Sequence, residues 1–172
     1  FAGAGTTLLV PGAEGQWAWA GLGPREGLTR AGFAEAIAKG FAALREAGAA
    51  RLALSLPEGL PWAQGPSARY AGEALWMAAY AFERYRTRAK PRPGPEIELV
   101  AADAAAAATG LEQAAHVGRA IALARDLINE PAAVAHTEHL IEQARQVAAR
   151  AGAQCRVIAG DELARQGYGA IH

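Results

Sequence analysis

A long alanine-rich segment between Asp103 and Pro131 constrains this chain more than any other feature. Its larger apolar residues recur at roughly helical spacing, which predicts one helix from residue 104 to about Asn129. The Asp103 carboxylate can accept an orphan backbone N–H at the start of the helix, and Pro131 disfavours helix in the residue before it. We interpret this helix as the connection between two folding units. Asn129 and Pro131 are expected to fix the direction of the chain at its end.

Short apolar runs alternate with helical patterns elsewhere in the chain. Strands are predicted at residues 6–10, 17–23, 51–57, 96–100 and 154–159, the first of them buried. Helices are predicted at residues 30–47, 68–85 and 137–150, and a short last helix ends near residue 166. Thr29 is the predicted cap of the first of these helices, Thr137 of the third and Asp161 of the last. This alternation predicts an α/β fold with a mainly parallel sheet flanked by helices.

Spacing also indicates which residues the first two of these helices bury. The predicted buried positions are Phe33, Ile37, Phe41 and Leu44, then Ala71, Leu75, Ala78 and Phe82. After the long helix, one helix, one strand and one short helix cannot bury both faces of a sheet. We therefore expect residues 132–172 to open a second domain, with residues 1–108 as the first domain and residues 109–131 as the linking helix.

Composition and charge narrow the possible partners. The chain is 52% hydrophobic with 17 basic and 17 acidic residues, so we expect neither nucleic acid nor an anionic membrane as a partner. The single cysteine, Cys155, excludes an intrachain disulfide and a cysteine-rich metal cluster, and we interpret it as a buried strand residue. No apolar run approaches the roughly 20 residues of a membrane span, and a cytoplasmic protein is expected.

Two patterns suggest ligand binding and have simpler interpretations. The glycines between Gly21 and Gly27 follow a strand as in a dinucleotide-binding turn, but the third glycine is misplaced and Pro24 lacks an N–H for a pyrophosphate, which favours a structural turn. His136 and His139 flank Glu138 at a spacing that zinc could use, but a site needs further protein ligands. We interpret the two histidines as exposed residues at a helix start.

Other polar groups are interpreted as structural. Asp126 and Glu130 form an exposed like-charge pair on the long helix, and His116 is a packing residue. The basic strip, defined as Arg84, Arg86, Arg88, Lys90 and Arg92, is interpreted as a solvated connection, because it lacks interleaved base-stacking aromatics. Ser55 and Ser67 are the only serines, and neither lies in a nucleophile elbow.

Three segments resemble the leucyl aminopeptidase (M17) family of metallopeptidases. Residues 124–131 read Ala-Arg-Asp-Leu-Ile-Asn-Glu-Pro, which is similar to the A-R-D-L-x-N-x-P run that opens the catalytic domain of that family. Residues 137–140 and 162–171 also resemble segments of the family, and they follow in the order expected for it. Residues 72–85 resemble the G-x-x-L-x-x-x-Y-x-F-[DE]-x-Y helix of its amino-terminal domain, and residues 21–23 match a strand-end turn.

The resemblance implies a macro-domain-like amino-terminal α/β domain, a linking helix and the beginning of a catalytic aminopeptidase domain. It also implies a homo-hexamer that removes amino-terminal residues from peptides with two divalent ions, zinc or manganese. The metal ligands of the family lie in motifs such as N-T-D-A-E-G-R, which this sequence lacks. We therefore expect no catalytic, cofactor-binding or metal residue in this segment, and no hydrolysis by the segment alone.

Two alternatives belong to other functional classes. One is a macro-like module that binds a nucleotide such as ADP-ribose through the turn between Gly21 and Gly27. The other is a non-catalytic regulatory or assembly subunit that acts with a separate catalytic chain.

Overall fold

The computed structural model describes residues 3–13, 15–87 and 94–170 and has a mixed α/β fold, as the sequence predicts. The chain forms two compact units, Phe1–Arg125 and Asp126–His172, and the long helix α3 (Ala104–Asn129) crosses the boundary between them. None of the helices in the described ranges is long and apolar enough to span a membrane.

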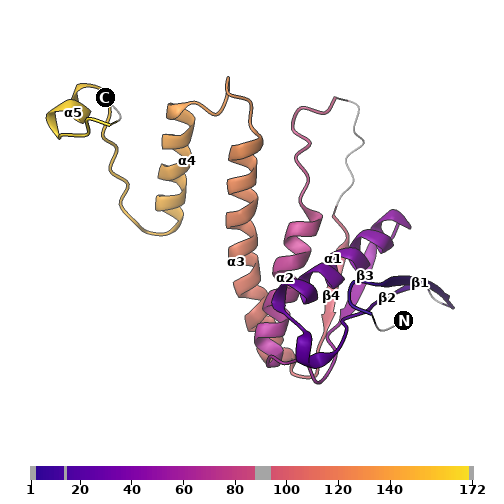
Figure 1. Ribbon diagram of the computed structural model, residues 1–172. Coiled ribbons are helices and arrows are strands. Elements are labelled where there is room, and N and C mark those ends of the chain that lie inside the picture. The colour runs from indigo at the N-terminus through magenta and orange to yellow at the C-terminus, as the bar shows by residue number, and fades with distance from the viewer. Residues whose placement is uncertain (1–2, 14, 88–93, 171–172) are drawn as a thin grey trace. The chain divides into compact units, whose positions relative to one another are not determined.

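The strands of the first unit form two small sheets (Figure 1). Strands β1 (Thr7–Gly12) and β2 (Gly15–Ala20) form an antiparallel hairpin, because only a short turn joins them. Strands β3 (Arg51–Ser55) and β4 (Glu96–Val100) are parallel, and this pairing requires the long crossover that contains helix α2 (Gln64–Ala79). The parallel pairing expected from the sequence is thus found in β3 and β4.

Helix α1 (Arg30–Glu46) follows the 3₁₀ turn Arg25–Gly27 and begins as predicted. The Gly32 N–H donates to the Thr29 hydroxyl over 3.1 Å, which satisfies one of the orphan donors of the first turn. Beyond its last residue, Gly48 adopts a φ of +87°, a conformation that favours glycine. Phe33, Ile37 and Phe41 are buried as predicted, whereas Leu44 is half-buried.

Helix α2 differs from the prediction at both ends. It begins at Gln64 rather than near Ala68, because Pro66 falls in the first turn, where the missing N–H is not needed. It ends at Ala79 rather than Tyr85, and Phe82 therefore lies outside it. Arg125 donates from Nη1 to the Met77 carbonyl oxygen over 3.2 Å, and its guanidinium carbon lies 3.9 Å from the centre of the Tyr80 ring. This arginine satisfies a carbonyl that the helix end leaves without an intrahelical donor.

The expected burial of the first strand is wrong. Leu8 and Leu9 are 47% and 40% exposed, and Trp17 and Trp19 on β2 are also exposed. The hairpin packs on helix α1, where Gly40 faces the Ala18 and Ala20 side chains, so only one of its faces contacts a helix of this unit. Leu8, Trp17 and Trp19 lie on the other face and remain accessible to solvent, while Leu9, opposite Ala18, is partly exposed on the face that packs on α1.

The core of the first unit lies between helices α1 and α2 and the parallel strands. It contains Phe33, Ile37, Leu56, Ala68, Ala71, Ala74 and Ala107. Helix α3 approaches α2 closely, because glycines and alanines line the contact: Gly72 faces Ala114, and Gly118 faces the Trp76 ring. Small side chains allow two helix backbones to come within a short interaxial distance.

The second unit contains helices α4 (Thr137–Arg150) and α5 (Asp161–Arg165). The predicted caps Thr137 and Asp161 are wrong by one position: both are the first helical residues, and His136 and Gly160 occupy the cap positions. The strand predicted at residues 154–159 is wrong, because no strand in the described part of the chain pairs with this extended segment. Cys155 is accordingly exposed rather than buried.

The start of helix α3 provides a direct test of the capping argument. Asp103 Oδ1 accepts the Ala106 N–H over 3.0 Å. We expect Asp103→Ala to lower the free energy of unfolding by about 1 kcal/mol, whereas Asp103→Asn, which keeps an acceptor, has a smaller effect. Urea denaturation measures both variants, and an equal loss for the two would contradict the cap.

Candidate functional site

The glycine turn predicted from the sequence forms a tight connection. Gly23 has a φ of +73°, and Arg25–Gly27 makes one 3₁₀ turn after Pro24. A Cβ on Gly23 would lie 3.1 Å from the Ala4 side chain, so the turn packs against the chain near its start. These contacts support the interpretation of a structural turn.

A buried acidic residue, Glu73, organises the surface between helices α1 and α2. Its side chain is only 7% exposed and accepts hydrogen bonds from two arginines. Arg69 Nε lies 2.7 Å from Glu73 Oε1, and Arg30 Nη2 pairs with Oε2. The hydrogen bond and the negative charge of Glu73 raise the pKa of the Arg69 guanidinium. The arrangement neutralises the carboxylate and holds the two helices together.

Aromatic rings continue this cluster toward the core. The Arg30 guanidinium carbon lies 4.6 Å from the centre of the Tyr70 ring. Tyr70 and Trp62 meet edge to face with centroids 5.3 Å apart, and Trp62 packs against Phe33 at 5.7 Å. Arg30 is therefore held by a charge on one side and by an aromatic face on the other.

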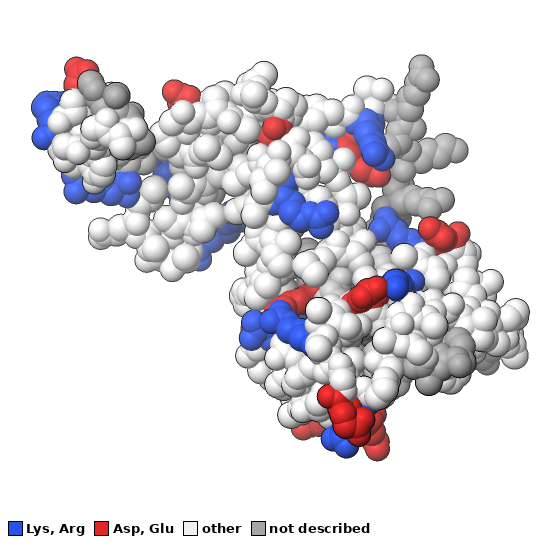
Figure 2. Space-filling view, viewed as in Figure 1, with Lys and Arg blue, Asp and Glu red and all other residues white. Residues whose placement is uncertain are grey.

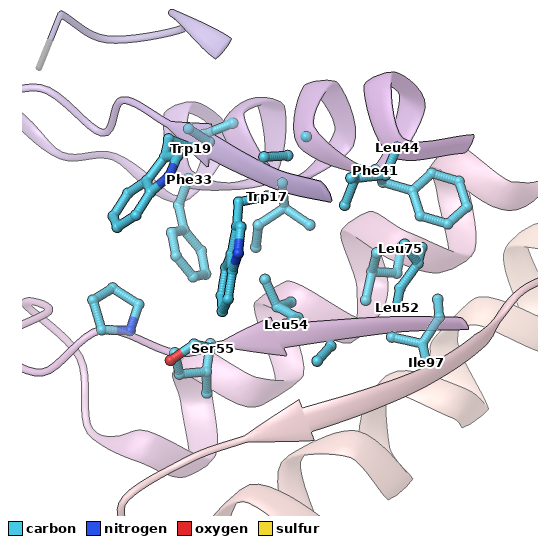
Figure 3. A pocket seen from close by; sticks show the side chains of 18 of the residues that line it. Trp17, Trp19, Phe33, Phe41, Leu44, Leu52, Leu54, Ser55, Leu75 and Ile97 are labelled. Atoms are coloured by element: carbon cyan, nitrogen blue, oxygen red, sulfur yellow. The ribbon is translucent and has the colours of Figure 1, made fainter. Parts of the chain in front are cut away.

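An apolar cavity with a volume of about 530 Å³ lies in the described part of the first unit (Figure 3). Strands β2 and β3 lie on opposite sides of it, and helix α1 contributes Phe33, Ile37 and Phe41. Ser55 is the only hydroxyl-bearing residue among those that line it. A site of this composition can bind an apolar group or a peptide backbone but contains no acid–base pair.

The two histidines near the start of helix α4 are not brought into a larger cluster. His136 is exposed as expected, and its Nδ1 lies 2.9 Å from Glu138 Oε2. His139 is half-buried. Among the residues that the structure describes, no three His, Cys, Asp or Glu side chains gather in a way that could hold a metal ion.

The Glu138 carboxylate provides a prediction for pH dependence. Its own backbone N–H and the His136 ring lower its pKa below the ordinary value. A lowered folded-state pKa means that this contribution to stability is present above the ordinary glutamate pKa and is lost as the pH falls through the lowered one. We expect His136→Ala to raise the pKa of Glu138 partway back, because the backbone contribution remains. Carboxyl-carbon NMR titration measures this, with His139→Ala as a control that leaves the pKa unchanged.

Three polar residues of helix α3 and the turn after it differ from their predicted environments. Glu130 is buried and Asp126 is half-buried, so the predicted exposed pair is wrong. Glu130 lies where the helix ends and the chain turns, rather than on an exposed helix surface. His116 is exposed rather than packed, and its Nδ1 lies 3.1 Å from Arg119 Nη2. The helix contacts α2 through Gly110, Ala114 and Gly118 instead.

The described part of the basic strip is exposed. Arg84 lies with its guanidinium carbon 5.9 Å from the centre of the Phe82 ring, and Arg86 is also exposed. Arg88, Lys90 and Arg92 lie outside the described residues. The face in Figure 2 shows side chains of both signs spread among uncharged ones. The exposure of Arg84 and Arg86 supports the interpretation of a solvated connection for the described part of the strip.

Sequence reasoning missed the two features that organise the first unit. The spacing of Arg69 and Glu73 is the i,i+4 pattern of a helical ion pair, and this signal could have been used. Nothing in the sequence connects Arg30 with Glu73, which are 43 residues apart. The cavity was missed because it depends on how β2 and β3 are placed around helix α1.

The fold and these sites define a class of protein: an α/β domain followed by a long helix that runs into a second unit. A tomato leucine aminopeptidase has this fold, with a TM-score of 0.75 at 19% identity over 87% of this chain and 30% of that one. The bottromycin maturation enzyme BotP in complex with Mn gives a TM-score of 0.77 at 28% identity, over 96% of this chain and 35% of that chain.

The sequence identifies the family. The model of the N-terminal domain of the cytosol aminopeptidase family matches residues 2–89, about half of the chain, and the chain therefore belongs to this family. The resemblance stated from the sequence is confirmed.

Curated relatives agree with this assignment. A probable cytosol aminopeptidase of Syntrophotalea carbinolica is 37% identical over 129 residues, which are 71% of this chain and 26% of that protein. One from Geobacter sp. is 32% identical over 155 residues, covering 88% of this chain and 31% of that protein. The chain spans between a quarter and a third of the length of these relatives.

Proposed function

We propose that residues 1–172 form the non-catalytic front part of a metal-dependent aminopeptidase that removes amino-terminal residues from peptides. The match of residues 2–89 to the N-terminal domain of the cytosol aminopeptidase family carries this proposal. The names of the relatives support the activity of the whole protein, and the segment itself serves folding, assembly and access to the active site.

The metal ions belong to this proposal as well. The family resemblance implies two divalent ions, zinc or manganese, and the manganese in the BotP complex supports the class of metal. Bound ions of this kind activate a water molecule and polarise the scissile carbonyl. The donor set of the described residues does not fit such a site, since no group of three suitable side chains occurs there. We propose that no residue of this segment ligates the ions or takes part in the chemistry.

The organisation of the protein follows from the same proposal. Residues 1–108 form the amino-terminal domain, residues 109–131 the linking helix and residues 132–172 the beginning of the catalytic domain. Helix α3 ends at Asn129, and the Pro131 carbonyl accepts the N–H groups of Val134 and Ala135, which supports a structural role for the junction. We further propose a cytoplasmic homo-hexamer that acts on peptides with a free amino terminus.

An activity assay tests the proposal. Residues 1–172 and the full natural polypeptide are each incubated with a leucyl chromogenic amide and manganese. We expect manganese-dependent turnover by the full polypeptide alone, abolished by a chelator. Metal-dependent turnover by residues 1–172 would contradict the non-catalytic role, and an inactive full polypeptide would contradict the aminopeptidase assignment. Calorimetric titration of residues 1–172 with ADP-ribose is expected to show no binding, which separates this proposal from a nucleotide-binding module.

A further inference from the structure

The edge of strand β3 that faces away from β4 carries unused backbone groups. The Leu56 N–H donates to the Val100 carbonyl over 2.9 Å, and Leu52 lies opposite Ile97 in this parallel ladder. Because parallel strands use every second residue toward a given neighbour, the even-numbered residues of β3 face β4. The backbone N–H and C=O groups of Ala53 and Ser55 therefore point to the other edge, where no strand pairs in the described part of the chain.

Strand β2 has a corresponding edge on the side away from β1. The Gly21 N–H donates to the Thr6 carbonyl over 2.8 Å and the Gly21 carbonyl accepts the Gly5 N–H over 3.0 Å, so the backbone groups of Gly21 point toward the chain of β1. Successive residues of a strand direct their backbone groups to alternate edges, so Ala18 and Ala20 fall in non-hydrogen-bonded pairs of the ladder. Their backbone groups point away from β1, and no other strand among the described residues pairs with them.

These two edges border the same cavity. Ala18 and Ala20 line it on one side and Ala53 and Ser55 on the other, and all four have backbone groups that the ladders leave unpaired. Figure 3 shows β3 passing beneath the Trp17 and Phe33 side chains, with helix α1 behind them. The cavity thus offers backbone donors and acceptors on both sides and an apolar surface on α1.

We infer that this cavity receives a β-strand of about five residues from the same polypeptide, outside residues 1–172. The strand pairs with β2 along one edge and with β3 along the other, and it joins the two small sheets into one. Its side chains on one face are apolar, because that face packs on helix α1. The inserted strand supplies partners for backbone groups that otherwise have only water.

The unprotected character of both edges supports a permanent partner strand. Natural proteins protect exposed strand edges with proline, charged residues or bulges. The outer edge of β1 carries such protection, since Pro11 lies in a non-hydrogen-bonded pair with Gln16. In contrast, alanine and serine occupy the outward-facing positions of β2 and β3 at the cavity. These edges therefore have the composition of interior strand edges.

The location of the cavity favours a strand of the same polypeptide over a separate peptide. Phe33 and Ile37 belong to the core and also line the cavity, so its occupant completes the core of the first unit. A tethered strand binds at high effective concentration and avoids most of the entropic cost of association. The relatives, three to four times as long as the matched segment, contain the additional polypeptide that such a strand requires.

Hydrogen exchange tests this inference on residues 1–172 and on the full natural polypeptide. We expect the Ala18, Ala20, Ala53 and Ser55 amides to exchange at least about tenfold more slowly in the full polypeptide, together with a short protected segment outside residues 1–172. The Leu9 amide, on the outer edge of β1, serves as the control and exchanges rapidly in both. Equal exchange of the four amides in the two proteins would overturn the inference. Protection that appears only with dimerisation in sedimentation would also overturn it, since a second copy would then be the occupant.

A matched pair of proline substitutions provides a second readout. Leu9 and Ala18 are directly opposite each other in the hairpin, and their N–H groups point to opposite edges. In the full polypeptide we expect Ala18→Pro to lower the Tm more than Leu9→Pro, because only the former removes a donor to the inserted strand. In residues 1–172 alone this difference disappears. Equal Tm values for the two variants in the full polypeptide would contradict the inserted strand.

Discussion

Gly110→Ala is expected to lower the free energy of unfolding of the first unit by about 2–3 kcal/mol. A Cβ at this position would overlap the Gly65 carbonyl oxygen and would lie 3.0 Å from the Arg69 backbone nitrogen. Both atoms belong to the backbone at the start of helix α2, which cannot rotate aside as a side chain can. Helices α2 and α3 must therefore separate, and the core contacts of Ala107 and Ala114 weaken with them.

Gly40→Ala in helix α1 is the matched control. Gly40 is also a buried glycine inside a helix, but its added Cβ would meet only the Ala18 and Ala20 side chains at 3.9 and 4.0 Å. We expect this variant to be neutral or to gain up to about 1 kcal/mol from the higher helix propensity of alanine. Urea denaturation followed by circular dichroism measures both. A Gly110→Ala variant as stable as Gly40→Ala would refute the close contact of α2 with α3.

Gly118→Ala should have an intermediate effect. The obstructing group there is the Trp76 ring, which is 40% exposed and can move toward solvent. Gly110→Ala should therefore destabilise the protein more than Gly118→Ala, because its new Cβ meets backbone atoms rather than a mobile side chain.

The sequence predicted most accurately those elements whose limits depend on local chemistry. Helix α3 begins after Asp103 and ends at Asn129, where a cap and a proline act within a few residues. Strand β4 has the predicted limits because its residues alternate clearly between apolar and polar. The α/β class followed from the same local patterns.

Features that depend on distant residues could not be predicted in this way. Helix α2 ends before Tyr80, where Arg125, far along the chain, bonds the Met77 carbonyl. The segment at residues 154–159 has a strand-like sequence, but a strand also requires a neighbour that provides hydrogen bonds. Local periodicity reports neither of these requirements.

The same distinction applies to the candidate sites. The turn at Gly23 and the exposure of His136 were predicted from the sequence, because both depend on adjacent residues. The cavity beside β3 was missed, since its walls come from elements joined by no sequence motif. The sites found only in the structure are those built from several elements.

Removing both arginine partners of Glu73 should be the other strongly destabilising change. In Arg30→Met/Arg69→Met, a carboxylate that is 7% exposed loses both of its cationic hydrogen-bond donors. Leaving a buried charge without compensation costs about 3–5 kcal/mol, and we expect a loss of about 3 because both arginines reach solvent. Each single variant should lose less, since the other arginine remains.

The physical reason is tested by repeating the double change in a background that lacks the buried charge. In Glu73→Met, the arginines have no carboxylate to neutralise, so adding Arg30→Met and Arg69→Met should cost less than about 1 kcal/mol. The difference between the two backgrounds, measured by urea denaturation, isolates the interaction of the carboxylate with its partners. An equal cost in both backgrounds would mean that the arginines stabilise the fold through their hydrocarbon stems and the Tyr70 ring, independently of Glu73.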